Sequence, residues 1–168
     1  MTRRPIIAVS SCLLGQQVRY DAEIKHFPSL LTFINLYFEP ITVCPEVEIG
    51  LSVPRPPVQL MNDPDQPQMV GRDDPGIDIT APMQQFCEQR PLSLQNICGY
   101  IFKSRSPSCG IHDVPVFDRD NHIIQYGSGL FARAIHQHLP NIPMVDETEL
   151  VTERQQQQFL QQVLNIFK

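Results

Sequence analysis

The chain has 168 residues, of which 42% are hydrophobic and 18% charged, a composition that fits a globular protein and excludes a disordered chain. A formal net charge of −5 argues against a nonspecific nucleic-acid binder, which needs a basic face. No apolar stretch approaches the roughly 18 residues of a membrane span. The N-terminal segment MTRRPIIAVSSC lacks a cleavage pattern, so we interpret it as a strand rather than a signal peptide. We expect a single domain over residues 1–168.

Short apolar runs alternate with helical patterns along the chain. Buried strands are predicted where apolar and β-branched residues run without a break, at residues 5–10, 41–44, 99–103 and 142–145. Helical spacing of apolar residues predicts helices at residues 27–38, 129–139 and 147–167, with a further helix after Thr80, its expected N-cap. Strands that alternate with helices predict an α/β fold, with a three-layer α/β/α, Rossmann-like arrangement around a mainly parallel sheet.

Residues 45–77 differ from the rest of the chain in composition. They contain seven of the sixteen prolines together with Gly50, Gly71 and Gly76, and they show no sustained hydrophobic period. Long loops in compact domains are commonly functional. We therefore expect an ordered, proline-rich loop beside a site, with a flexible tip at MNDPDQPQM.

The five cysteines are widely spaced and odd in number, unlike those of a secreted disulfide scaffold, so we expect reduced thiols and a cytoplasmic protein. Cys87 lies on the inner face of a predicted helix and Cys98 at the start of a predicted strand, and we interpret both as core residues. Cys12, Cys44 and Cys109 each follow the carboxyl end of a predicted strand, where parallel sheets bind ligands. These three thiols are therefore predicted to converge on one site.

Three convergent thiols suit three kinds of chemistry. They can hold zinc with one open position, hold three irons of a [4Fe–4S] cluster with the fourth iron open, or act as a nucleophile with a resolving partner. Their spacing does not separate these alternatives, and His112 is the histidine best placed to join a zinc site, because it follows Cys109 closely. The serine-rich loop KSRSPSCG favours the cluster, because hydroxyls and backbone N–H groups donate hydrogen bonds to sulfides.

Several charged residues accompany these thiols in the sequence. Glu46 follows Cys44 across Pro45, and an extended backbone at that point would aim its carboxylate at the same site as a general base. Arg55 lies on the proline-rich loop, where it can clamp a phosphate or a carbonyl. Asp78 precedes a helix and either contributes to the site or caps that helix.

Four motifs, in this order, resemble those of the thiouracil desulfurase family: SSCLLGQQVRYD, CPEVEIGLSVPRPP, GIDIT and KSRSPSCG. The similar region runs from the N-terminal strand to the helix near residue 130. The resemblance implies an enzyme that binds a [4Fe–4S] cluster through Cys12, Cys44 and Cys109, with the fourth iron open to the substrate sulfur. It implies that water replaces the sulfur of a thiolated uracil at carbon, which leaves a carbonyl on the base and sulfide on the cluster.

The same resemblance implies roles for other residues of these motifs. Glu46 is the implied base for the attacking water, and the implied serine is Ser106 or Ser104, of which we prefer Ser106. The further candidates for substrate binding are Asp21, Arg55, Asp78, Lys103 and Ser108. With a net charge of −5, we expect a free thiolated base or nucleotide as substrate, and neither a stable nucleic-acid partner nor a membrane. The alternative is a non-catalytic metal-binding or sulfur-carrying protein, against which Glu46 beside a ligand favours the enzyme.

Overall fold

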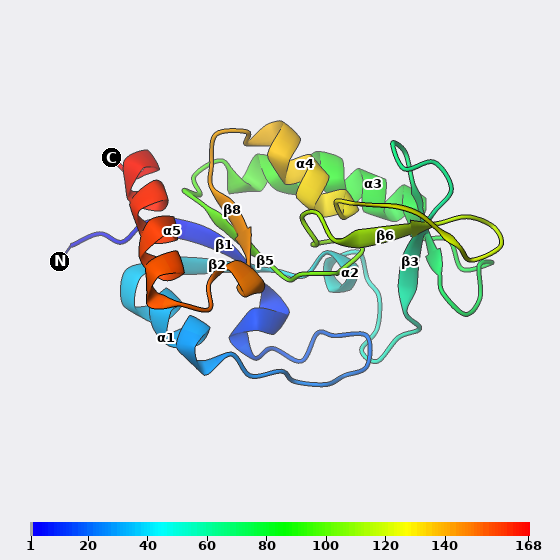
Figure 1. Ribbon diagram of the computed structural model, residues 1–168, viewed down its shortest axis with the longest axis horizontal. Coiled ribbons are helices and arrows are strands. Elements are labelled where there is room, and N and C mark those ends of the chain that lie inside the picture. Colours follow the sequence, from blue (N-terminus) through cyan, green and yellow to red (C-terminus); the bar gives the residue numbers. More distant parts are fainter. Residues whose placement is uncertain (1) are drawn as a thin grey trace.

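The computed structural model describes residues 2–168 and contains two four-stranded sheets. Sheet A is parallel throughout, in the order β2-β1-β5-β8, and forms the centre of the molecule (Figure 1). Its strands are β1 (Ile6–Ser10), β2 (Glu39–Val43), β5 (Tyr100–Phe102) and β8 (Met144–Asp146). The chain places β2 on one side of β1 and later places β5 on the other side, so the strand order reverses between β1 and β5. These strands correspond to the four predicted from apolar runs.

Helices cover both faces of sheet A (Figure 1). One face carries α1 (Pro28–Tyr37) and α5 (Glu153–Ile166), and the other carries α3 (Thr80–Gln89) and α4 (Leu130–His138). Successive side chains of a strand point to opposite faces, and β1 follows this rule. Ile7 and Val9 join the core under α1 and α5, whereas Ala8 joins the core under α4. The predicted three-layer α/β/α arrangement around a mainly parallel sheet is confirmed.

The proline-rich segment 45–77 contains more regular structure than its sequence indicates. It begins with the short helix α2 (Pro45–Glu48) and later forms an antiparallel hairpin of β3 (Val58–Met61) and β4 (Gln68–Gly71). Strand β3 also pairs in parallel with β6 (Val114–Phe117), which forms a second hairpin with β7 (Ile123–Gly127). These strands are only four or five residues long and have prolines around them, so they show no clear alternating period.

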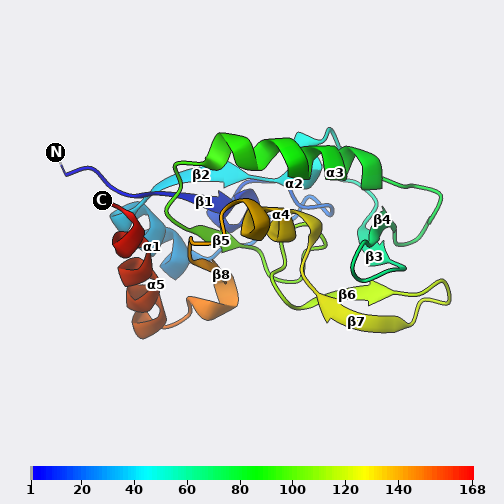
Figure 2. The same cartoon turned by 90° about the horizontal axis from the view of Figure 1, so that it is seen from above.

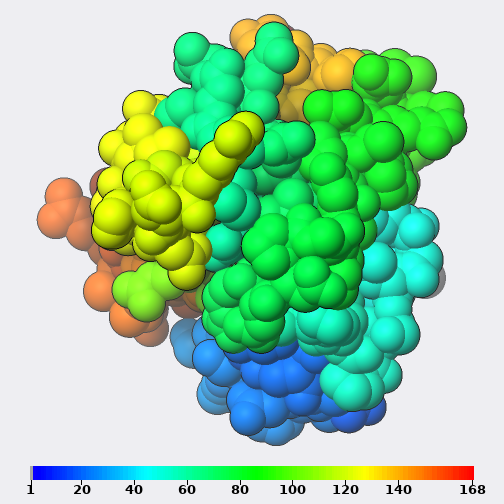
Figure 3. Space-filling model, turned by 90° about the vertical axis from the view of Figure 1, so that its right-hand side faces the viewer, coloured from blue at the N-terminus to red at the C-terminus, as the bar shows by residue number. Residues whose placement is uncertain are grey.

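Sheet B, in the order β4-β3-β6-β7, lies at one end of the molecule, beyond the edge of sheet A (Figure 2). Its core consists of Leu60 and Val116 packed against Ile79 and Met83 at the start of α3. Seen from this end, the surface shows the segments of the two hairpins above the loop that follows β1 (Figure 3). The tip MNDPDQPQM is the turn of the β3–β4 hairpin, and Arg133 of α4 donates to its Pro64 carbonyl at 2.8 Å.

Two helix boundaries differ from expectation. The helix predicted over residues 147–167 is divided into a 3₁₀ turn, Glu147–Glu149, and α5, because Thr152 and Gln155 form a capping box that starts a new helix. At α3, Thr80 is the first helical residue rather than the N-cap, and its hydroxyl accepts a hydrogen bond from the Met69 amide instead. Among residues 2–168, every helix is too short or too polar to cross a lipid bilayer.

Candidate active site

One cavity of about 710 Å³ lies at the carboxyl edge of sheet A, and Cys12, Cys44 and Cys109 all line it. Cys12 lies in a 3₁₀ turn, Ser11–Leu14, that begins directly after β1. Cys44 directly follows β2, and Cys109 lies in the loop after β5. The structure therefore brings the three strand-end thiols together at the position where the strand order of sheet A reverses, as expected for a ligand site in a parallel sheet.

The three thiols are partly or almost fully buried, and burial controls their protonation. It raises the pKa of Cys12 to about 11 and also raises the pKa of Cys44. Cys109 is 5% exposed, and burial raises its pKa well above the ordinary value, although a hydrogen bond with the Ser10 side chain acts in the opposite direction. Thiols with raised pKa values are protonated and weakly nucleophilic near neutral pH, which argues against the nucleophile alternative. A metal group has to displace these protons on binding.

The separation of the thiols bears on the kind of group that they can hold. Within residues 2–168, the three cysteine sulfurs do not all lie within 4.8 Å of one another. A tetrahedral zinc site with Zn–S bonds of about 2.3 Å needs sulfurs about 3.8 Å apart. A [4Fe–4S] cluster distributes its ligands over separate irons and suits a wider set. The donor set therefore fits the cluster better than one zinc ion, and His112 is exposed and does not line the cavity.

Glu46 lines the cavity from α2, and its neighbours orient its carboxylate. The extended backbone expected here is wrong, because Pro45 occupies the first turn of α2, a position that suits proline. Glu46 Oε1 accepts a hydrogen bond from Arg55 Nε at 3.1 Å, and Oε2 accepts one from Ser108 Oγ at 3.3 Å. The Glu46 side chain is only 12% exposed. The site thus contains a proton acceptor held in a mostly dehydrated wall.

The Arg55 guanidinium is bonded to the protein on several sides. Its side chain is 5% exposed, and besides Glu46 it donates to the carbonyl oxygens of Ser52, at 3.2 Å, and Val18, at 2.8 Å. These bonds join the loop after β1 to the proline-rich segment. These contacts hold Arg55 against Glu46, and three of its five N–H groups are used in them. Because Arg55 also lines the cavity, the clamp on a phosphate or a carbonyl stays a prediction.

The serines of the loop KSRSPSCG lie in three different environments. Ser104 is buried, and its hydroxyl donates to Glu147 Oε1 at 2.6 Å. Ser108 is also buried and donates to Glu46. The Ser106 oxygen accepts hydrogen bonds from two backbone N–H groups of its own loop, at 3.2 and 3.1 Å, and Ser106 lines the cavity. A hydroxyl whose oxygen accepts both of these bonds keeps its hydrogen for a ligand, so the geometry favours Ser106 over Ser104.

Three of the predicted substrate ligands, Asp21, Asp78 and Ser108, do not line the cavity. Asp21 accepts two hydrogen bonds from Arg19, at 3.1 and 2.8 Å, which lower the pKa of Asp21 to about 2. Arg19 itself lines the cavity, so Asp21 contacts a residue of the cavity wall without being part of that wall. Asp78 is exposed and accepts a hydrogen bond from the Thr80 N–H at the start of α3, which is the capping alternative of the sequence analysis.

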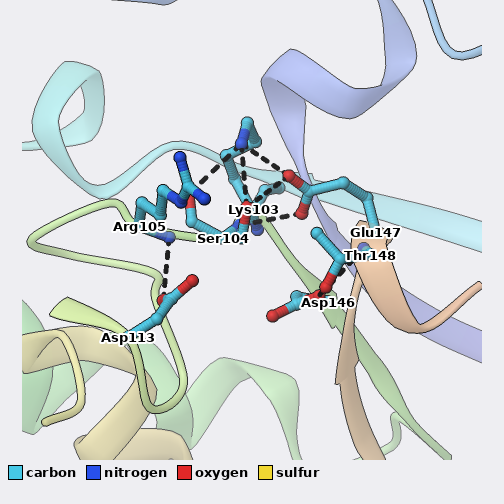
Figure 4. A network of polar contacts seen from close by, with 8 residues as sticks. Lys103, Ser104, Arg105, Asp113, Asp146, Glu147 and Thr148 are labelled. Atoms are coloured by element: carbon cyan, nitrogen blue, oxygen red, sulfur yellow. Dashed lines mark hydrogen bonds and ion pairs between the residues drawn. The ribbon is translucent and has the colours of Figure 1, made fainter.

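Sequence reasoning missed several residues of the cavity wall, among them Arg19, Lys25 and Glu147. Glu147 forms an ion pair with the predicted site residue Lys103, with Nζ and Oε1 2.5 Å apart (Figure 4). A usable signal existed for Glu147, because it directly follows a core strand and so lies at the same sheet edge as the cysteines. Arg19 and Lys25 lie in the long loop after Cys12, where no pattern distinguishes them from other surface cations.

The fold and the cavity together define a class of protein. It is an α/β protein that gathers three thiols and one oriented carboxylate in a cavity at the carboxyl edge of a parallel sheet. The chain belongs to the 2-thiouracil desulfurase family, whose sequence model matches residues 7–147. The match confirms the resemblance drawn from the four motifs and the prediction that the chain is an enzyme.

A solved structure described as a [4Fe-4S]-dependent thiouracil desulfidase, TudS, has a similar fold. Its TM-score against this chain is 0.65 at 29% sequence identity, and the alignment covers 88% of this chain and 93% of TudS. Because the alignment spans most of both chains, they share an architecture and not only a local motif. The search among curated proteins returned no significant match.

Proposed function

We propose that this chain removes sulfur from thiolated uracils with a [4Fe–4S] cluster held by Cys12, Cys44 and Cys109. The observation that carries the proposal is the convergence of these thiols on one cavity beside an oriented carboxylate. Membership of the 2-thiouracil desulfurase family and likeness to TudS, which is described as [4Fe-4S]-dependent, support it. Cys12, Cys44 and Cys109 would hold the cluster, and an iron left without a protein ligand would supply a Lewis acid for the sulfur of the substrate.

The reaction exchanges C=S for C=O, with water as the source of oxygen and sulfide as the leaving group. Glu46 takes a proton from the water that attacks the thiocarbonyl carbon, which is the task of a general base. Its hydrogen bonds with Arg55 and Ser108 fix the direction of the carboxylate before the substrate arrives. The remaining hydrogen of Ser106 can be donated to an oxygen or nitrogen of the pyrimidine.

The cavity suits a small substrate. Its volume of about 710 Å³ lies within the roughly 300–1,000 Å³ typical of small-molecule sites. A free thiolated base or its nucleotide fits this size, and the net charge of −5 disfavours a long nucleic acid. All five cysteines are free thiols in the described residues, which suits the reducing cytoplasm proposed for this enzyme.

The test is anaerobic reconstitution of the chain with iron and sulfide, followed by measurement of bound iron, bound sulfide and uracil released from 2-thiouracil and 4-thiouracil. We expect about four irons per chain, a broad brown absorbance, and release of uracil and sulfide in equal amounts. The protein without iron should release none. A chain that is active with zinc alone would overturn the proposal. A chain that binds the cluster and carries sulfide without turnover would favour the sulfur-carrier alternative.

A further inference from the structure

Lys103 and Glu147 lie beside each other because of the strand register of sheet A. Strands β5 and β8 are parallel, and Phe102 of β5 is paired with Asp146 of β8. The next residue of each strand therefore emerges at the same place on the carboxyl edge. Lys103 Nζ and Glu147 Oε1 are 2.5 Å apart, with side chains 19% and 8% exposed (Figure 4).

The hydrogen bonds of this pair form a closed group with Ser104. Lys103 Nζ donates to Glu147 Oε1 and to the carbonyl and hydroxyl oxygens of Ser104, both at 3.2 Å. An ammonium has three hydrogens, so these contacts account for all of them. Glu147 accepts further bonds from the Ser104 hydroxyl, at 2.6 Å, and from the Ser104 backbone N–H, at 2.7 Å. Neither Lys103 nor Ser104 has a hydrogen left for a substrate, although both were predicted to take part in substrate binding or catalysis.

The pair lines the same cavity as Cys12. The Lys103 backbone N–H donates to the Ser10 hydroxyl at 3.0 Å, which ties the end of β5 to the end of β1 two residues before Cys12. The Lys103 ammonium and the Glu147 carboxylate place opposite charges in this wall, with side chains 19% and 8% exposed. In a wall of low dielectric constant, such opposed charges act strongly on whatever is bound at the thiol.

We propose that Lys103 and Glu147 are positioning residues that form a charge-balanced pair, in which each charge cancels the shift that the other would cause in the reduction potential of a cluster held at Cys12. The inference rests on the proposed function for the cluster itself. Each charge alone would shift the potential, because the net charge around an iron–sulfur cluster is one of the factors that determine it. The cation would favour the reduced, more negative cluster, and the carboxylate would oppose it. Together they hold the first residues of the hydroxyl-rich loop and present an almost neutral wall.

A charge-balance cycle tests this proposal on the reconstituted full-length chain. The variants are Glu147→Gln, Lys103→Met and the double variant, and the measurement is the midpoint potential of the cluster in an anaerobic redox titration followed by EPR. Glu147→Gln leaves an unpaired cation and should raise the potential, whereas Lys103→Met leaves an unpaired anion and should lower it. The double variant should return close to the wild-type value. The iron content of each variant is measured in parallel.

Glu149→Gln is the matched control. Glu149 lies on the same 3₁₀ turn as Glu147 and carries the same charge, but it is exposed and does not line the cavity. Its carboxylate accepts a hydrogen bond from the Asp146 N–H, and glutamine serves equally well in such a capping box. We expect the wild-type potential in this variant, because a charge in solvent is screened from the cluster.

Shifts of opposite sign that cancel in the double variant would support charge balance. Shifts of the same sign, or no shift beyond that of Glu149→Gln, would overturn it in favour of a purely structural role. If Glu147→Gln binds no cluster, the double variant decides: restored iron supports charge balance, and continued absence overturns it. A wild-type chain that takes up no iron would defeat the proposed function and this inference together, which distinguishes that failure from the others.

Discussion

Two walls of one cavity each carry a mostly buried ion pair, and the two pairs are bonded differently. The Glu46 wall consists of Glu46 and Arg55, with Ser108 bonded to Glu46 without lining the cavity itself. The Glu147 wall consists of Lys103, Ser104 and Glu147. On the Glu46 wall, Arg55 also donates to two backbone carbonyls, and each Glu46 oxygen accepts one hydrogen bond. On the second wall, Glu147 Oε1 accepts from both Lys103 and Ser104, and Oε2 accepts from the Ser104 backbone.

The difference shows that an acid beside a cation is not enough to identify a base. A carboxylate oxygen has about two lone-pair positions, so both oxygens of Glu46 keep one for a proton, whereas on Glu147 Oε1 is saturated and only Oε2 keeps one. Arginine makes this possible on the Glu46 wall, because its planar fork reaches a carboxylate and two carbonyls at once. Lysine on the Glu147 wall concentrates its charge at one point and is enclosed by its acceptors.

The largest effect should come from removing what both walls share, the three thiols. Cys12→Ala, Cys44→Ala and Cys109→Ala should each lose the cluster and all desulfidase activity, because each removes one of three ligands. Cys87→Ala and Cys98→Ala should keep both, since neither residue lines the cavity. Iron and sulfide analysis after reconstitution provides the measurement. A full iron content in any of the first three variants would remove that cysteine from the ligand set.

The next effect separates the two walls. Glu46→Gln keeps the shape of the side chain and removes its basicity, so the rate of uracil release should fall by roughly two to four orders of magnitude. The cluster should still assemble, because no ligand changes. Steady-state turnover at verified iron content provides the measurement, with Glu39→Gln, an exposed acid at the start of β2, as control. Near-normal turnover in Glu46→Gln would exclude it as the base.

The variant Arg55→Lys tests whether the planar guanidinium of Arg55 contributes more to the rate than its positive charge does. Lysine keeps the positive charge but cannot reach Glu46, Val18 and Ser52 together, so Glu46 loses its fixed direction. We expect a rate about ten- to a hundredfold lower with unchanged iron content, on the scale of a small misplacement of a catalytic group. Equal turnover in Arg55→Lys and the wild type would show that the charge alone suffices.

The free energy of unfolding of the cluster-free chain, measured as the pH falls, tests the contribution of Glu147. Burial opposes ionisation of Glu147, but hydrogen bonds from Lys103 and Ser104 lower its pKa below the ordinary value of 4.5. A lowered pKa in the folded state means that the stabilisation is complete above that value and is lost as the pH falls through the lower, folded pKa. Urea unfolding of Glu147→Gln should therefore lose less stability on acidification than the wild type. A parallel loss in both would show that Glu147 makes no such contribution.

The smallest expected effect is on stability, from a substitution at Tyr100, which does not line the cavity. Tyr100 of β5 is fully buried, and its hydroxyl has no hydrogen-bond partner among residues 2–168. Its ring stacks on Phe102 with centroids 3.7 Å apart, and phenylalanine preserves that contact. Tyr100→Phe should stabilise the cluster-free chain by about 1 kcal/mol, because it removes an unpaired buried polar group. Thermal and urea unfolding measure the change, and a clear destabilisation would mean that the hydroxyl does have a partner.

Several features of the fold and the site followed from sequence patterns alone. Continuous apolar runs identified the strands of sheet A, and helical spacing identified the helices on its faces. The parallel strands share one carboxyl edge, so the positions of Cys12, Cys44 and Cys109 after three of them predicted their convergence. Local motifs were enough for these conclusions, because strand ends and helical periods are properties of short segments.

Other features were decided only by the tertiary structure. The choice between Ser104 and Ser106 depends on Glu147, which lies 43 residues from Ser104 and reaches it through the register of β5 against β8. Likewise, Arg55 is held beside Glu46 in part by the Val18 carbonyl, which lies 37 residues away in the chain and is brought to it by the loop after β1. A hydrogen bond needs its two atoms within about 3.5 Å, and no sequence period specifies which distant donor and acceptor meet. Strand pairing and loop packing determine which distant donors and acceptors form hydrogen bonds. They thereby determine which polar residues remain available to a substrate.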